Sequence, residues 1–140
     1  MAIDAGRLKH LEIIQQVITR MAGNSFLLKG WSVTLLSAIL AIAVKDGMYR
    51  MVWIGFLPVL MFWMLDGYFL RQERLYRRLW NHVRVEGQEM PADFGMDTSP
   101  FARDVASWLQ VSFSKTLLSF HGTLVIVLVA VLIATYKAGH

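Results

Sequence analysis

The sequence predicts an all-α membrane protein with three transmembrane helices, a cytosolic helical extension and an amino-terminal amphipathic helix. Residues 26–44 and 51–70 contain one charged side chain each, and residues 116–136 contain none. At about 1.5 Å per residue, each of these stretches is long enough to cross the roughly 30 Å of hydrocarbon in a bilayer. A short polar break separates the first two stretches, which predicts a helical hairpin.

The overall composition agrees with a small membrane protein. The hydrophobic fraction of 56% exceeds the roughly 45–50% that is usual in soluble domains. With 140 residues there is room for a single polytopic membrane domain, residues 1–140. The chain has no cysteine, which excludes disulfides, thiol catalysis and cysteine metal sites. The charged start does not resemble a cleavable signal, so the first span is expected to be an uncleaved anchor.

Residues 4–22 are expected to form the amphipathic helix, because apolar side chains recur at spacings of three and four. These apolar positions are Leu8, Leu11, Ile14, Ile18 and Met21. We expect this helix to pack on other helices in the cytosol, with the lipid interface as the alternative location. Gly23 and Asn24 are poor helix formers and predict a break or bend there. Ser25 would then cap the helix that follows.

The first span, residues 26–44, has a stripe of small side chains along one helical face. The stripe comprises Gly30, Thr34, Ser37, Ala38 and Ala41. Small residues allow another helix to approach closely in lipid, where apolar side chains alone provide no driving force for association. A polar pore lining would have the same pattern, so helix packing and pore lining both stay open, with packing favoured.

The second span, residues 49–70, is expected to continue as a cytosolic helix to residue 85. Pro58 lacks a backbone donor and predicts a kink, which makes it a candidate hinge. Beyond residue 70, nothing in the sequence stops the helix, and a cytosolic basic face is formed by Arg71, Arg74, Arg77, Arg78 and Arg84. Arginines directly after a span indicate the cytosolic side of a membrane.

Residues 86–99 form an acidic loop, the candidate site for a soluble partner. Helix-breaking glycine and proline residues lie among its four acids, which are Glu86, Glu89, Asp93 and Asp97. Ser99 and Pro100 are typical of a helix start, so an amphipathic helix is expected over residues 100–115. The third span is expected over residues 116–137.

Charge placement predicts the orientation in the membrane. Eleven of the 14 basic residues lie in segments that share a side with the amino terminus, and three, Lys45, Arg50 and Lys137, lie on the other side. Because basic loops stay in the cytosol, the amino terminus is expected there and the carboxy terminus outside.

Three ionisable residues lie inside the expected spans. Lys29 and Asp66 are almost equally distant from the outer turn at Gly47, roughly 27–29 Å along their helices, so an antiparallel hairpin can bring them together. His121 falls near the same level. Three roles are open for Lys29 and Asp66, namely a structural ion pair, a gate or ion path, and unpaired side chains that reach the interface. For His121 a hydrogen-bonded structural role is favoured.

No pattern in the sequence indicates enzymatic catalysis. There is no glycine-rich phosphate loop, no Gly-x-Ser-x-Gly and no HExxH, and no two histidines have metal-ligand spacing on a helix. We therefore expect no catalytic residues, no metal and no cofactor. The arginine helix, with Tyr76 and Trp80 interleaved, contains the elements of a nucleic-acid surface. Anionic head groups explain the same arginines better, so the bilayer is the expected partner and nucleic acid is not.

The layout resembles the SLATT group of small bacterial membrane proteins. The resemblance covers about residues 5–85 and rests on architecture. It includes the amino-terminal helix, the segment 24–31 (Asn-Ser-Phe-Leu-Leu-Lys-Gly-Trp) that opens the first span, and the arginine-rich continuation of the second. The third span is not part of that pattern. The resemblance implies an effector or accessory protein of an antiphage system, which disrupts the membrane when a cytosolic sensor is activated, and it transfers no catalytic residue. The expected location is the bacterial inner (cytoplasmic) membrane.

Two main functional hypotheses follow. The first is a homo-oligomeric membrane effector that forms or gates a pore, since three spans alone cannot enclose a channel. The second is a non-conducting anchor or regulatory subunit that recruits a soluble cytosolic protein through the acidic loop and its cytosolic helices. A third, an ion or proton carrier, is the weakest, because one shallow charge cluster provides no path across the bilayer.

Overall fold

The computed structural model describes residues 4–85 and 93–138, and it is helical as predicted. Its elements are α1 (Ala5–Lys45), α2 (Arg50–Ile54), α3 (Phe56–Val85), the 3-10 helix η2 (Ser99–Phe101), α4 (Trp108–Ser112) and α5 (Lys115–Ala138). No strand occurs among these residues. Three helical segments are long and apolar enough to cross a membrane, namely α1, α2 with α3, and α5.

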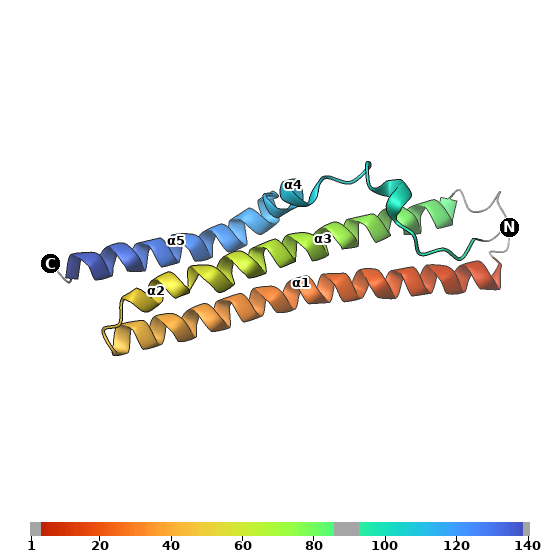
Figure 1. Ribbon diagram of the computed structural model, residues 1–140. Helices are drawn as coiled ribbons and strands as arrows, with labels where there is room; N and C mark the ends of the chain where they lie inside the picture. Colours follow the sequence, from red (N-terminus) through yellow and green to blue (C-terminus); the bar gives the residue numbers. More distant parts are fainter. Residues whose placement is uncertain (1–3, 86–92, 139–140) are drawn as a thin grey trace.

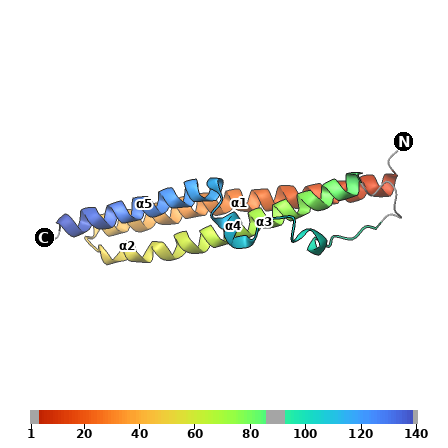
Figure 2. The same cartoon turned by 90° about the horizontal axis from the view of Figure 1, so that it is seen from above.

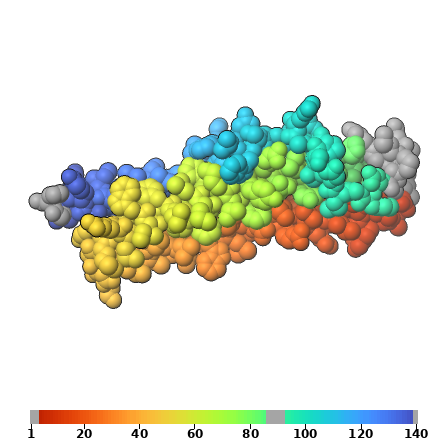
Figure 3. All heavy atoms as spheres, viewed as in Figure 1, coloured from red at the N-terminus to blue at the C-terminus, as the bar shows by residue number. Residues whose placement is uncertain are grey.

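The helices form an elongated bundle. Helix α1 lies antiparallel to α2 and α3 along almost the whole molecule, and α5 packs beside them over only one half (Figures 1 and 2). The other half is covered by the segment that contains η2, which lies over the ends of α1 and α3 in the space-filling view (Figure 3). The carboxy-terminal end of α5 and the start of α1 therefore lie at opposite ends of the molecule.

Helix α1 is continuous, so the break predicted at Gly23 and Asn24 is wrong. The expected helices 4–22 and 26–44 are one helix of 41 residues, about 60 Å long. A glycine inside a helix costs only about 1 kcal/mol relative to alanine. Packing of α1 against α3 on both sides of Gly23 outweighs this local cost. Ser25 consequently does not cap a helix.

The hairpin turn that joins α1 to α2 depends on Gly47. Its φ angle of +64° lies in the left-handed region, which side chains with a Cβ rarely adopt. The last turn of α1 closes with a hydrogen bond from Asp46 N to Ile42 O. This tight turn makes α1 and α2 antiparallel neighbours, as the sequence predicts.

The second long helix is interrupted at Gly55, between α2 and α3, rather than at Pro58. Pro58 has no N–H to donate to the carbonyl of Ile54, and its ring crowds that carbonyl. The disturbance therefore lies one turn before the proline. Helix α3 then runs without interruption to Val85, as expected. Whether Pro58 acts as a hinge stays a prediction.

The prediction of one helix over residues 100–115 is wrong, because the structure contains only the short helices η2 and α4 there. Phe101, in η2, packs against the core, and Val105, between η2 and α4, is buried. Helix α4 starts later than predicted, at a capping box in which the Ser107 side chain accepts from Gln110 N and the Gln110 side chain accepts from Ser107 N. Tertiary contacts with α3 therefore replace a continuous local helix.

Two apolar clusters lie at opposite ends of the bundle. The first joins α1 to the far end of α3 and contains Leu11, Ile14, Ile18, Leu79 and Val83. The second joins α1, α2, α3 and α5 and contains Leu36, Ala43, Val52, Val59 and Leu128. The buried side chains between these two clusters include a group of polar ones.

Gly67 allows α4 to lie directly against α3. A Cβ at this position would overlap Ser112 Oγ and would lie 3.0 Å from Ser112 Cβ and 3.2 Å from its Cα. Ser112 is fully buried, and its hydroxyl donates to Trp108 O at 2.9 Å. The approach of backbone to backbone therefore requires glycine.

We predict that Gly67→Ala lowers the free energy of unfolding by about 1–3 kcal/mol, the usual cost of overpacking. Thermal unfolding of the purified chain in detergent, followed by circular dichroism, measures the effect. Gly23→Ala is the matched control, because a Cβ there meets no atom within 4 Å. An unchanged Tm in Gly67→Ala would contradict the tight α3–α4 contact.

Candidate functional site

A buried polar cluster joins three helices between the two apolar clusters. Ser25 and Lys29 come from α1, Asp66 from α3 and His121 from α5. Ser25 and Lys29 are four residues apart and therefore lie on the same face of α1. This face is turned toward α3, whose Asp66 is fully buried. The cluster includes all three ionisable residues that the sequence places inside the spans.

The carboxylate of Asp66 is the common acceptor of the cluster. Its Oδ2 lies 2.5 Å from Lys29 Nζ and 2.8 Å from His121 Nε2. Its Oδ1 accepts a short hydrogen bond from Ser25 Oγ. Lys29 Nζ also donates to Ser25 Oγ at 2.9 Å, which closes a ring of hydrogen bonds between α1 and α3. Three donors on one buried carboxylate compensate for its lost hydration.

The contact between Asp66 and His121 is the basis for assigning the histidine tautomer. An ionised carboxylate can only accept a hydrogen bond, so we assign the hydrogen to Nε2, which then donates to Asp66 Oδ2. The Nδ1 atom is buried and has no hydrogen-bond partner among the described residues. Trp63 stacks on the imidazole, with ring centroids 5.8 Å apart and an interplanar angle of 9°. Trp63 is itself oriented by donating from Nε1 to Ser112 O at 2.7 Å.

Lys29 lies at the edge of the cluster. Its side chain is 22% exposed, whereas Asp66 and His121 are fully buried. Its ammonium group lies 5.9 Å from the centre of the Phe120 ring. Lys29 therefore connects the buried carboxylate to the surface of the bundle.

Chemically, the cluster links helices. One anion holds donors from α1 and α5, so the side chain of Asp66 determines how both helices align with α3. Among residues 4–85 and 93–138, no group of three or more His, Cys, Asp and Glu could hold a metal ion. In comparisons with known proteins, no family model, no curated protein and no solved structure matches this chain.

The sequence reasoning missed three residues of this site. Ser25 was interpreted as a helix cap, although its four-residue spacing from Lys29 on one helix could have indicated a shared role. Trp63 follows the distribution of aromatic residues toward the ends of membrane helices, and this pattern gives no sign of its stacking on His121. Ser112, on α4, carries no sequence signal for its contact with Trp63 and Gly67, because that contact depends on the tertiary fold.

The predicted stripe of small residues does not contact α3. All five members, Gly30, Thr34, Ser37, Ala38 and Ala41, are exposed in the single chain. The buried residues of this part of α1, including Ser32 and Leu36, lie on another face. The Thr34 hydroxyl donates to Gly30 O, so it is satisfied within its own helix.

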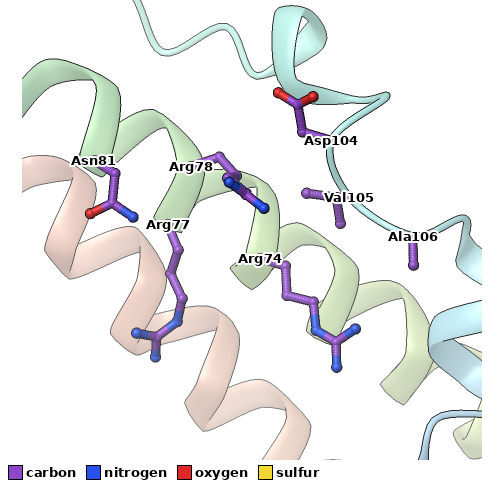
Figure 4. A pocket seen from close by; sticks show the side chains of 7 residues that line it. All are labelled: Arg74, Arg77, Arg78, Asn81, Asp104, Val105 and Ala106. Carbon is purple, nitrogen blue, oxygen red and sulfur yellow. The ribbon is translucent and has the colours of Figure 1, made fainter. Parts of the chain in front are cut away.

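The predicted basic residues lie apart from the buried cluster. Arg71 Nε donates to Ala106 O at 3.1 Å, Arg77 pairs with Glu73, and Arg84 lies over the Trp80 ring. Arg74, Arg77 and Arg78 line a recess beside residues 104–106 (Figure 4).

The described part of the acidic loop is folded against the ends of α1 and α3. Glu86 and Glu89 lie outside the described residues. Asp93 Oδ1 accepts from Gly95 N, whose carbonyl contacts His10 Nε2 at 3.1 Å. Hydrogen bonds from the Ser99 hydroxyl and then from its N–H lower the pKa of the Asp97 carboxyl below its ordinary value. These aspartates therefore stabilise local turns.

We predict that Asp66→Asn lowers the free energy of unfolding by about 3–5 kcal/mol, because it leaves Lys29 without its anion in a buried site. Thermal unfolding in detergent measures the loss. Adding Lys29→Met to Asp66→Asn should restore part of it, since the unpaired charge is then removed.

The exposed pair Lys9–Glu12 provides the control for this prediction. Glu12→Gln should change stability by no more than about 1 kcal/mol, as is usual for exposed pairs. A loss in Asp66→Asn as small as that in Glu12→Gln would refute the structural role of the cluster.

Proposed function

We propose that this protein crosses the bacterial inner membrane three times and assembles into an oligomer that forms or gates a pore. The amino terminus and the arginine-rich end of α3 would face the cytosol, and the carboxy terminus would face the outside. The observation that carries the oligomer is the small-residue stripe on α1, which is exposed and is not covered by any part of residues 4–85 and 93–138.

The exposed apolar surface supports insertion into lipid. Phe26 is 77% exposed, Trp31 57% and Ile126 69%, all on helices long and apolar enough to span. An apolar groove of about 1130 Å³ also opens between α2 and α5 near the end of the bundle. Such surface is costly in water and favourable in hydrocarbon. The basic residues are concentrated toward the other end, which supports the cytosolic orientation.

The stripe supports association of copies through α1. At 100° per residue, Gly30, Thr34 and Ser37 lie on a face roughly opposite the one that packs on α3. Small side chains on a lipid-facing surface let two helices approach closely enough for extensive van der Waals contact. A ring of copies joined in this way can enclose a path that one chain cannot.

The buried cluster supports a coupled movement of helices. Because Asp66 contacts both Lys29 on α1 and His121 on α5, a movement of α5 would be transmitted to the helix that bears the stripe. The resemblance to the SLATT group adds a biological setting, an effector in antiphage defence. The long cytosolic ends of α1 and α3 would then receive the activating signal.

The oligomer can be tested by cysteine cross-linking, since the natural chain has no cysteine. We predict that Ala38→Cys forms a disulfide-linked dimer in membranes under oxidising conditions. Ile126→Cys, at another exposed position on α5, is the matched control and should stay monomeric. Gels run without reducing agent provide the measurement. Equal dimer formation by both variants would mean random collision and would contradict the interface.

Conduction can be tested with dye-loaded liposomes. We predict that the reconstituted chain releases a small dye, and that Ala38→Leu reduces the release because its larger side chain separates the helices. The Cβ of residue 38 points away from the bundle, so the monomer fold should be unchanged, and circular dichroism checks this point. If the vesicles retain their dye although the oligomer is intact, the pore is ruled out and the non-conducting anchor is favoured.

A further inference from the structure

A recess with a cationic wall lies on the side of α3, away from the buried polar cluster. It has a volume of about 320 Å³ and lies between α3 and residues 104–106. Arg74, Arg77 and Arg78 come from α3 on one side of the recess, and Val105 and Ala106 lie on the other side. In Figure 4 the Arg78 side chain is directed toward the segment 104–106, whereas Arg77 extends away from it. The volume is at the lower end of the range for small-molecule sites.

Two of the three arginines are not neutralised by the described part of the chain. Arg77 shares the carboxylate of Glu73, with Nη2 and Oε1 2.7 Å apart. Arg74 and Arg78 form no hydrogen bond or salt bridge within residues 4–85 and 93–138. The carboxylate of Asp104 is turned away from the guanidinium groups in Figure 4. Two like charges four residues apart on a helix repel each other, and a bound anion relieves this repulsion.

The wall opposite the arginines is held in place. Arg71 Nε donates to Ala106 O, and Val105 is buried against the bundle. The capping box of Ser107 then starts α4 directly after this wall. The recess therefore exists before any ligand binds, which reduces the ordering cost of binding.

We propose that this recess binds a phosphate group, either of a phospholipid head group or of a small soluble phosphate. Guanidinium groups present paired N–H donors that match the oxygens of phosphate, and charge-assisted hydrogen bonds of this kind are the strong ones. Arg74 and Arg78 line the same recess from consecutive turns of α3, so their long side chains can both turn toward a single phosphate. The proposal does not depend on pore formation.

If α2 and α3 cross the membrane as proposed, the recess lies at the level of the lipid phosphates. Counting 20 residues from Arg50, the hydrocarbon ends near residue 70, and Arg74 then lies about 6 Å beyond it. Head-group regions extend about 5–7 Å from each side of the hydrocarbon. Arg78, about 12 Å beyond, lies at the border with the cytosol, where a soluble phosphate also has access.

The test uses the full chain purified in dodecyl maltoside micelles. The sample is titrated with pyrophosphate, with phosphatidylglycerol, and with oleate as a carboxylate control, while Tm is measured by circular dichroism. We expect a phosphate source to raise Tm, because it binds the folded state. The double variant Arg74→Gln/Arg78→Gln should need at least about tenfold more of that source for the same shift.

Two further variants keep the result interpretable. Ala106→Leu fills the recess and retains every charge, so it should also lose the response. Arg20→Gln/Lys115→Gln also removes two positive charges, but outside the recess, and it should respond like the natural chain. A rise in Tm with phosphatidylglycerol alone indicates that the recess binds a lipid head group. A rise with pyrophosphate alone indicates that it binds a soluble phosphate. Either result supports the site.

Four outcomes would overturn the proposal. They are no shift with either phosphate source, an equal shift with oleate, an equal loss in the Arg20→Gln/Lys115→Gln variant, and a full response in Ala106→Leu. None of these outcomes bears on dye release or on cross-linking through α1, so a failure of this site is distinguishable from a failure of the proposed function.

Discussion

The buried carboxylate of Asp66 is the constraint on which the arrangement of the helices depends. An anion without water must receive hydrogen bonds, and here α1 supplies two donors and α5 supplies one. Hydrogen bonds are directional, whereas apolar contacts tolerate sliding. The cluster therefore determines the relative positions of α1, α3 and α5 more strictly than the apolar clusters on either side of it.

The two apolar clusters face different physical conditions if the chain spans the bilayer as we propose. The cluster around Ile14 and Leu79 would belong to the cytosolic extension, where burial from water stabilises packing. The cluster around Leu36 and Leu128 would lie in lipid, where apolar burial alone provides no driving force between helices. Close contacts such as that of Gly67 with Ser112, and the polar cluster, then become the interactions that hold this half together.

The described chain leaves two surfaces of different character unoccupied. The small-residue stripe of α1 is uncharged and lies on a helix suited to lipid. The recess of Arg74 and Arg78 is cationic and lies beyond the expected hydrocarbon. Because their chemistry differs, they suit different partners, a second copy of the helix for the first and an anion for the second. Both are reached from outside the bundle, so neither requires the monomer to open.

The sequence by itself determined the features that depend on length, apolar content and spacing along one helix. Three long apolar helices, the tight turn at Gly47 and the continuation of α3 to Val85 follow from such local patterns. The approach of Lys29 to Asp66 also follows, because equal distances from one turn place two residues at one level of an antiparallel hairpin. The inner membrane, the orientation and the pore stay predictions.

Only the tertiary structure decided how these elements are joined. It made α1 continuous through Gly23 and Asn24, since contacts with α3 outweigh a local penalty of about 1 kcal/mol. It replaced the helix expected over 100–115 by η2, α4 and a segment packed along α3. It also brought Ser25, Trp63 and Ser112 to the candidate site. These outcomes depend on contacts between residues far apart in the chain, whose energies local periodicity and propensity do not contain.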